Sequence, residues 1–207
     1  NTINYSTELP LAQGIKFDLW LPDLKNPLYI ALVVFLSSCS QDPAEVLFED
    51  QRYYYDLPAF ISKQMDNLQG KGQWVRKHVT KDGHSHIIER GNIDWKEELD
   101  VFKESDINRP AWRGEFKVDS ISLERVFVIT YKTENEEIPV KNVVVTVDKD
   151  TKQCLQISVD RRTKNFLYSS DQSLYFTTGE GYMMKGKLSV TLLFDSEYSI
   201  ESEFIES

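Results

Sequence analysis

The sequence predicts an α+β domain in which two helices and a β-hairpin come first and a β-rich segment follows. Two amphipathic stretches, starting at Asp56 and Asp94, carry apolar residues at helical spacing. From Glu115 onward, short runs of alternating apolar and polar residues are separated by polar turn residues. Short turns join antiparallel neighbours, so we expect a curved antiparallel meander against which the two helices and the hairpin pack.

Upstream of this domain lies a short apolar run, Leu28–Leu36, which continues into Ser37-Ser38-Cys39. An apolar core followed by small residues is the layout of a secretory signal. The run is too short to cross a bilayer, which takes about 20 apolar residues. A buried strand over Ile30–Leu36 is the alternative. The polar, proline-containing residues 40–43 that follow favour the signal.

The four residues Leu36-Ser37-Ser38-Cys39 resemble the lipobox of bacterial lipoproteins. The resemblance implies that Cys39 becomes lipid-modified and is the first residue of the mature protein. We therefore interpret residues 1–38 as an upstream extension plus signal peptide, residues 39–51 as a lipidated tether and residues 52–207 as one domain. Ser40 follows the cysteine, and in enteric-type sorting this residue implies the outer membrane rather than the inner one.

The composition is acidic, with 33 Asp and Glu residues against 24 Lys and Arg residues and a formal net charge of −9. Nucleic acid and anionic lipid headgroups bind basic patches, so this balance argues against either as the main partner. The chain has two cysteines, and lipidation would use the thiol of Cys39. We expect the other, Cys154, to be a small buried hydrophobic residue in a strand.

The first amphipathic helix is expected from Asp56 to Leu68. Asp56 can cap its N-terminus, Pro58 suits its first turn and Gly70 is the expected stop. Its apolar face consists of Leu57, Phe60, Ile61, Met65 and Leu68. Three consecutive tyrosines, residues 53–55, precede the helix, and we expect them to pack at its start rather than to form a carbohydrate or partner surface.

A β-hairpin is expected next, from Gln73–Thr80 and His84–Glu89, because Asp-Gly between such runs is a strong turn signal. It carries the three histidines of the chain: His78, His84 and His86. A three-residue loop would place all three on one face. A two-residue loop would pair Val79 with His86 and turn His78 to the other face.

Three imidazoles on one face would make a zinc or copper site. A solvent-facing hairpin that binds no metal is the simpler interpretation, because His-x-His on a strand is a weak signal. We therefore expect no cofactor.

The second helix is expected from Asp94, where Asp94 and Glu97 have the capping-box spacing. Its apolar stripe is Trp95, Leu99 and Phe102. The loop that follows contains Arg109, Trp112 and Arg113. These side chains could hold a ligand carboxylate or a sugar, since arginine offers a planar fork and tryptophan a stacking face. In the alternative, which we favour, Trp112 covers the core and the two arginines pair with the acidic helix.

Six strands are expected after the second helix, over residues 122–132, 139–148, 153–162, 165–178, 182–194 and 198–204. The last turn is placed at Asp195-Ser196-Glu197. Enzyme signatures are absent from the sequence: we find no phosphate-binding glycine loop, no Gly-x-Ser-x-Gly elbow and no His-Glu-x-x-His motif. We therefore expect a protein that is not an enzyme.

The lipobox, the segment DWKEELDVFKESDINRPAW (residues 94–112) and the carboxy-terminal β run together resemble an uncharacterised family of bacterial lipoproteins. The resemblance implies the cell envelope, with a lipid anchor at Cys39. The expected function is a membrane-tethered binding or assembly module with envelope proteins as partners. The alternative is a periplasmic half-barrel that carries lipid or another hydrophobic ligand. An unfilled apolar cavity on the concave face of the sheet would favour the carrier.

Overall fold

The computed structural model describes residues 53–206. The expected signal, the lipobox with Cys39 and the tether at residues 39–51 lie outside these residues. Within them, no helix is both long enough and apolar enough to span a bilayer.

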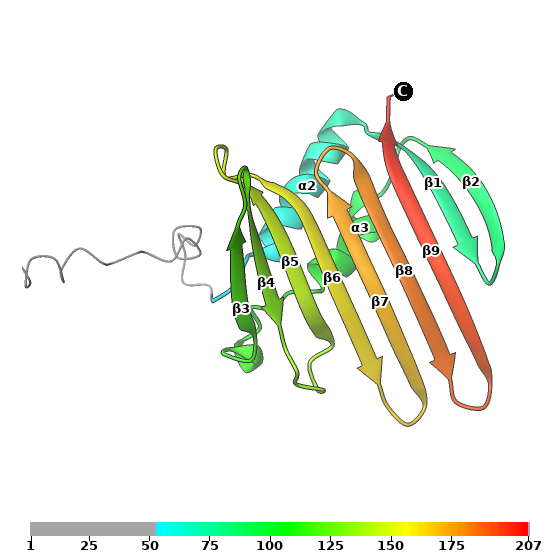
Figure 1. The fold of residues 1–207 in the computed structure, drawn as a ribbon. Coiled ribbons are helices and arrows are strands. Elements are labelled where there is room, and N and C mark those ends of the chain that lie inside the picture. The colour runs from blue at the N-terminus through cyan, green and yellow to red at the C-terminus, as the bar shows by residue number, and fades with distance from the viewer. Residues whose placement is uncertain (1–52, 207) are drawn as a thin grey trace, which may run out of the picture. The chain divides into compact units, whose positions relative to one another are not determined.

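The described chain forms one antiparallel sheet of nine strands with two α-helices (Figure 1), which confirms the α+β class. The strand order is β2-β1-β9-β8-β7-β6-β5-β4-β3. The elements, in chain order, are α2 (Leu57–Lys71), β1 (Trp74–Lys81), β2 (His84–Arg90), α3 (Trp95–Lys103), the 3-10 turn η2 (Pro110–Trp112), β3 (Lys117–Ser122), β4 (Val126–Lys132), β5 (Val140–Asp148), β6 (Cys154–Lys164), β7 (Tyr168–Thr177), β8 (Gly181–Val190) and β9 (Phe194–Ile205).

Strands β3 to β9 form a meander in which each strand pairs with the next along the chain. The β1–β2 hairpin joins this meander through its last strand, because β1 pairs antiparallel with β9 over its whole length. As a result, β9 lies inside the sheet, and β2 and β3 form its two edges.

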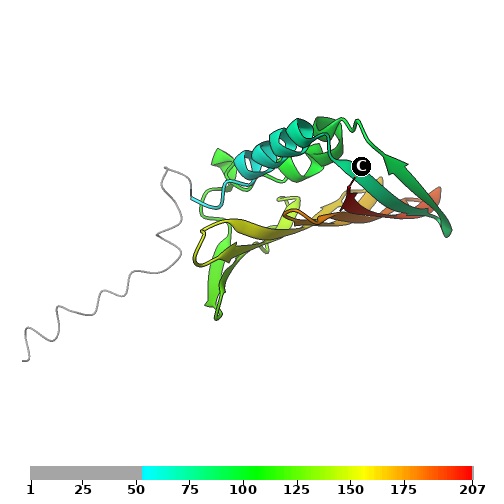
Figure 2. The ribbon, with the colours of Figure 1, turned by 90° about the horizontal axis from the view of Figure 1, so that it is seen from above.

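Both helices lie on the same face of the sheet (Figure 2). Asp56 caps α2 by accepting a hydrogen bond from the Ala59 amide at 3.1 Å, and Asp94 caps α3 by accepting from the Lys96 and Glu97 amides. The predicted stop at Gly70 is wrong. Helix α2 continues to Lys71 and ends at Gly72, whose φ of 60° is the left-handed conformation that favours glycine.

The hydrophobic core lies between the helices and the sheet. Phe176 on β7 is fully buried, and its ring packs edge-on against Phe60 of α2 and Phe102 of α3, with centroid distances of 5.9 and 6.1 Å. Trp95 of α3 packs in the same way on Phe204 of β9, at 5.8 Å. Aromatic side chains from both helices therefore fix the helices on the central strands.

The β1–β2 turn has two residues, Asp82 and Gly83, and both have positive φ, 48° and 83°. These values are typical of the type I′ turns that join two-residue hairpins. The register pairs Lys81 with His84 and Val79 with His86. The two-residue alternative is therefore the correct one, and His78 lies on the opposite face from the other two histidines.

Two predicted strand boundaries are wrong. The strand expected over residues 122–132 is β4, which begins only at Val126, and β3 before it was not predicted. The last turn lies at residues 191–193 rather than at Asp195–Glu197, since β8 ends at Val190 and β9 begins at Phe194. In the second case the apolar alternation runs through Leu192, so the sequence pattern alone extends the strand into the turn.

Candidate functional site

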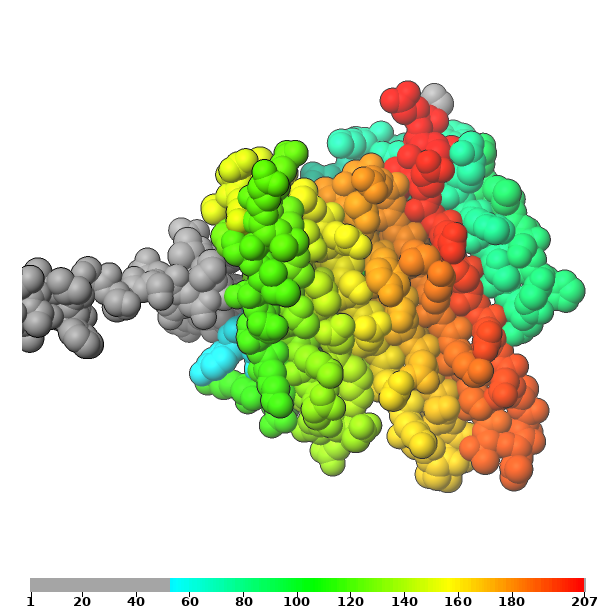
Figure 3. All heavy atoms as spheres, in the orientation of Figure 1, coloured from blue at the N-terminus to red at the C-terminus, as the bar shows by residue number. Residues whose placement is uncertain are grey.

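Over β6 to β9, the face of the sheet that points away from the helices is polar, and Figure 3 looks directly onto it. Register determines which side chains share this face, because residues paired across neighbouring strands point the same way. One cross-strand row on β6 to β9 consists of Arg162, Asp171, Lys187 and Glu197, with alternating charge. The next row includes Asp160, Ser173, Lys185 and Ser199. The strands thus present charges and hydroxyls in register.

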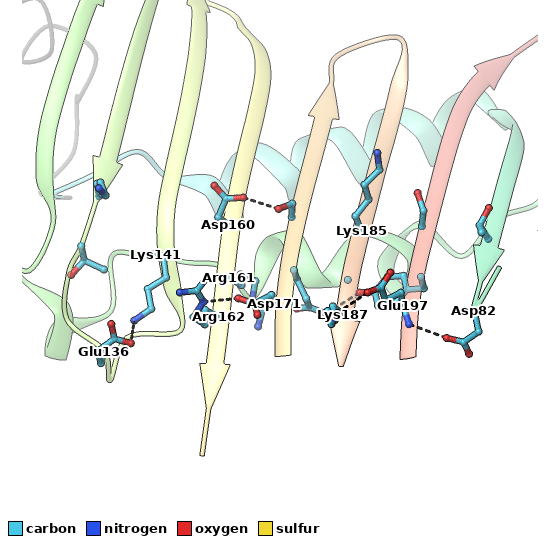
Figure 4. Close-up of a pocket in the computed structure, with 18 of the residues that line it drawn as sticks. Asp82, Glu136, Lys141, Asp160, Arg161, Arg162, Asp171, Lys185, Lys187 and Glu197 are labelled. Atoms are coloured by element: carbon cyan, nitrogen blue, oxygen red, sulfur yellow. Dashed lines mark hydrogen bonds and ion pairs between the residues drawn. The ribbon is translucent and has the colours of Figure 1, made fainter. Parts of the chain in front are cut away.

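A groove of about 980 Å³ follows these rows across the end of the sheet where the β4–β5 and β1–β2 turns lie (Figure 4). We call it the charged groove. Its charged lining includes Asp82, Lys141, Asp160, Arg162, Asp171, Lys185, Lys187 and Glu197.

The charges in the groove are arranged as local pairs. Nε of Arg162 lies 2.5 Å from Oδ1 of Asp171, and Nζ of Lys187 lies 2.8 Å from Oε1 of Glu197. The hydrogen bond to the carboxylate raises the pKa of Lys187, and the Asp171 carboxylate does the same for Arg162. Both cations therefore keep their charge at neutral pH.

Two further carboxylates are held by hydrogen bonds. Asp160 accepts from the Ser173 hydroxyl at 2.8 Å and from the Asn142 amide at 3.2 Å. At the rim of the groove, Asp82 accepts from the Glu197 backbone amide at 2.9 Å and from the Ser196 hydroxyl at 3.2 Å. The backbone hydrogen bond is the main reason why the pKa of Asp82 is lowered. Asp82 therefore holds the hairpin turn against β9.

The groove can bind polar groups, because exposed ion pairs contribute little to stability. A binding partner that brings its own charges or hydroxyls can replace one member of such an ion pair with little loss of folding stability. Opposite charges alternate along the row, so the groove suits a mixed polar surface better than a uniformly charged polymer.

The sequence signal for this groove was present but was missed. Asp160 and Arg162 are two residues apart on one strand, as are Lys185 and Lys187 on another. Side chains two apart on a strand share a face. Which charges become neighbours, however, depends on the strand register.

The three histidines do not come together. His84 and His86 lie on one face of the hairpin and His78 on the other, where it faces Ile87 across the strands. In residues 53–206 no group of three or more His, Cys, Asp or Glu side chains is placed to hold a metal ion. The arrangement that would have made the zinc or copper site is therefore not formed.

The arginines of the loop after α3 are held by aromatic rings. The Arg109 guanidinium lies 4.7 Å from the centroid of the Trp112 ring, and Arg113 lies 4.1 Å from that of Tyr53. Arg109 also donates to the Glu104 carbonyl at the end of α3, at 3.2 Å. Both arginines and Tyr53 line a small cavity of about 520 Å³, whereas Trp112 packs against the core.

Cys154 is buried and free, as expected. Its thiol donates to the Gln156 carbonyl, with 3.6 Å between sulfur and oxygen. Burial raises its pKa from 9.0 to about 11. Since the thiolate is the nucleophile, this environment makes Cys154 unreactive at neutral pH.

We expect iodoacetamide at pH 8 to leave Cys154 of folded residues 40–207 almost unlabelled, because only about one thiol in a thousand is then ionised. The same reagent in guanidinium chloride should label it fully, as intact mass spectrometry would show. The raised pKa also predicts that folding stability due to this thiol is fully present below pH 9 and is lost as the pH rises toward 11. Rapid labelling of the folded protein at pH 8 would contradict the buried position.

Comparison with known proteins gives no match: no protein-family model, curated protein or solved structure matches this chain.

Proposed function

We propose that this chain is a non-enzymatic lipoprotein of the bacterial cell envelope whose domain serves as a membrane-tethered binding or assembly module. The proposed anchor is a lipid on Cys39, and the proposed location is the outer membrane, on its periplasmic side or at the surface. The apolar run Leu28–Leu36 followed by Ser37-Ser38-Cys39 supports the anchor. The observation that carries the binding role is the charged groove on the helix-free face of the sheet.

The packing of the helices supports a binding module over a lipid carrier. A carrier needs an apolar cavity that the protein leaves unfilled. Here the apolar rows of the sheet are covered by α2 and α3, and the Phe60 and Phe102 rings contact Phe176 at the centre. The largest cavity described above, the charged groove, is lined by polar and charged side chains instead.

The proposed partner is an envelope protein that presents polar groups of both signs. The groove offers cations from Arg162, Lys185 and Lys187 and anions from Asp160, Asp171 and Glu197. Electrostatic complementarity of this kind gives specificity and fast association rather than high affinity by itself. Nucleic acid is a poor candidate, because the net charge of the chain is −9.

The anchor is tested by expressing the full chain with Cys39→Ser in a bacterial host fed with a radiolabelled fatty acid. We expect the wild-type protein to carry the label and to sediment with membranes. The Cys39→Ser protein should carry no label and leave the membrane fraction, whereas Cys154→Ala, the control, should keep both properties. Label that persists in Cys39→Ser would contradict the lipid anchor.

The groove is tested with the double substitution Arg162→Glu and Lys187→Glu in immobilised residues 40–207. An envelope protein retained by the wild type should be lost from this variant. The control is Arg76→Glu, which also breaks an exposed ion pair, with Glu89 at 2.7 Å, but lies away from the groove. Circular dichroism checks that both variants are folded. Equal retention by the groove variant and the wild type would rule out the groove as the binding surface.

A further inference from the structure

Two neighbouring hairpins end in apolar turns at the same end of the sheet (Figure 1). One is the β6–β7 turn at residues 165–167 and the other is the β8–β9 turn at residues 191–193. The backbone joins them, since the Thr191 amide donates to the Leu167 carbonyl at 2.9 Å. The Thr191 hydroxyl donates to the Phe166 carbonyl at 3.2 Å. The two turns therefore form one continuous projection.

This projection carries six large apolar side chains, which we call the apolar tip. Their exposed fractions run from 37 % to 99 %: Phe166 85 %, Leu167 56 %, Tyr168 37 %, Leu192 99 %, Leu193 77 % and Phe194 53 %. Single exposed apolar residues are common on protein surfaces, but a contiguous group of them marks an interaction site. Turns of this kind are normally built from Gly, Asn, Asp, Ser and Pro.

The apolar tip does not extend the hydrophobic core. Two rows of side chains on the helix-facing side separate it from the buried residues of β7 and β8. These rows are mainly polar and consist of Ser170, Leu188 and Ser196, then Gln172, Gly186 and Tyr198. Gln172 donates to the Tyr198 hydroxyl at 2.9 Å within the second row. The side chains of the tip therefore do not pack in the core of the domain.

Backbone strain points the same way. Leu192 has a φ of 63°, in the left-handed region, and its side chain is 99 % exposed. A branched residue is unfavourable there, and asparagine or glycine would form the same turn at lower cost. The local fold gains no packing from this leucine. A strained conformation that local packing does not require is a reason to infer function.

Several polar backbone groups of the tip have hydrogen-bond partners within the protein. The Asn165 side chain accepts hydrogen bonds from the Leu167 and Tyr168 amides at 2.8 and 2.9 Å. The Asn165 amide donates to the Tyr168 carbonyl, and the Leu193 amide donates to the Val190 carbonyl. Backbone groups that already have partners can leave water without losing hydrogen bonds, which is what contact with hydrocarbon requires.

We propose that the apolar tip inserts into the interfacial region of a lipid bilayer. Two convex turns offer no flat or concave surface to a folded partner, whereas a fluid bilayer needs no complementary shape. Aromatic side chains such as Phe166, Tyr168 and Phe194 suit the boundary between headgroups and acyl chains.

The charged residues nearest to the tip determine whether it prefers anionic lipid. Three cationic residues, Arg162, Lys164 and Lys187, are balanced by three anionic ones, Asp171, Asp195 and Glu197. Arg162 and Lys187 are already paired with Asp171 and Glu197. With no excess of positive charge, the tip has no electrostatic preference for anionic lipid. Insertion is therefore driven by apolar contact and occurs in zwitterionic membranes.

This inference deepens the proposed function and rests on it for the presence of a membrane. The 13 residues 40–52 between Cys39 and the described domain span at most about 45 Å when extended. Such a tether lets the tip reach the bilayer that holds the lipid. A second contact would fix the orientation of the domain on the membrane, which the lipid alone does not do.

The experiment uses residues 40–207, which contain the whole sheet and its core but neither Cys39 nor the apolar run before it. The protein is floated with phosphatidylcholine vesicles. The tip variant carries Phe166→Ser, Leu192→Asn and Leu193→Ser. The control variant carries Ile87→Ser and Ile121→Ser, two exposed isoleucines on β2 and β3.

We expect the wild type and the control variant to float with the vesicles and the tip variant to bind at least tenfold more weakly. The midpoint temperature of thermal unfolding should be no lower for the tip variant than for the wild type. Asparagine adopts the positive φ at residue 192 with less strain than leucine does. Absence of wild-type binding, or equal binding by the tip variant, would overturn the proposal. So would a wild-type dimer that the tip variant converts to a monomer with no change in vesicle binding. Since the protein used here lacks Cys39, a negative result does not bear on the lipid anchor. Label that persists in Cys39→Ser would contradict the anchor and would not bear on the tip.

Discussion

Replacing Phe176 with alanine is expected to lower the free energy of unfolding by about 3–5 kcal/mol. Phe176 is fully buried at the centre of the sheet, and its ring contacts side chains from three other elements. The neighbouring rings are those of Phe60 on α2, Phe102 on α3 and Phe204 on β9, with centroid distances of 5.9, 6.1 and 6.4 Å. These rings belong to rigid helices and a paired strand, so they cannot move together to fill the space.

Urea unfolding followed by circular dichroism measures this loss, and Phe166→Ala is the matched control. Phe166 is the same residue type with an exposed side chain, so its replacement should change the free energy of unfolding by less than about 0.5 kcal/mol. A loss below about 1 kcal/mol in Phe176→Ala would mean that the helices can approach the sheet when the ring is removed.

The second large effect is expected for Glu98→Ala on α3. The Glu98 carboxylate binds two groups of the sheet: Oε2 lies 2.5 Å from Nζ of Lys77, and Oε1 accepts a hydrogen bond from the Tyr182 hydroxyl. The side chains of Lys77 and Glu98 are only 15 % and 20 % exposed. Burial, with Glu98 as a further cause, raises the pKa of Tyr182, so its hydroxyl stays a donor throughout the physiological range.

Removal of the carboxylate leaves an ammonium and a hydroxyl without this partner in a poorly solvated site. We expect a loss of about 2–4 kcal/mol, somewhat less than for a fully buried pair because part of each side chain still meets water. The double variant Lys77→Met with Glu98→Leu should recover most of this loss, since it removes both charges and keeps the volume. If Glu98→Ala were as stable as the wild type in urea, water would already solvate the pair.

Local chemistry predicts much of the fold. Asp56 and Asp94 mark the starts of both helices, because their side chains can accept the free amides of the first turn. The antiparallel pairing of neighbouring strands follows from the shortness of the turns. The position of Cys154 in a buried strand also follows from alternation alone.

Features that depend on long-range contacts could not be predicted. The side of the hairpin on which His78 lies depends on the loop length, and the Lys81–Gly83 segment is compatible with two or three residues in the turn. The end of α2 was predicted at Gly70 but lies at Gly72, because either glycine can end a helix. The pairing of β1 with β9 joins segments more than a hundred residues apart, and no local pattern encodes it.

The candidate sites were missed for two different reasons. The charged groove needs the register that sets Arg162 beside Asp171 and Lys187 beside Glu197, and this register is not visible in any one strand. The apolar tip was missed because apolar residues are taken as evidence for strands or core. Leu192 continues the alternation of β8 and yet lies in an exposed turn.

The position of β9 has a consequence for how the chain acquires its structure. The hairpin and both helices leave the ribosome before most of the sheet, but β1 pairs with β9, which is the last strand of the described sheet in chain order. Until β9 is present, β1 and β8 each keep an unpaired edge, and the β1–β2 hairpin is not joined to the rest of the sheet. The domain therefore completes folding only after nearly all of it has been made. Such a delay fits the export that we propose, because a secretory channel threads chains that have not yet folded.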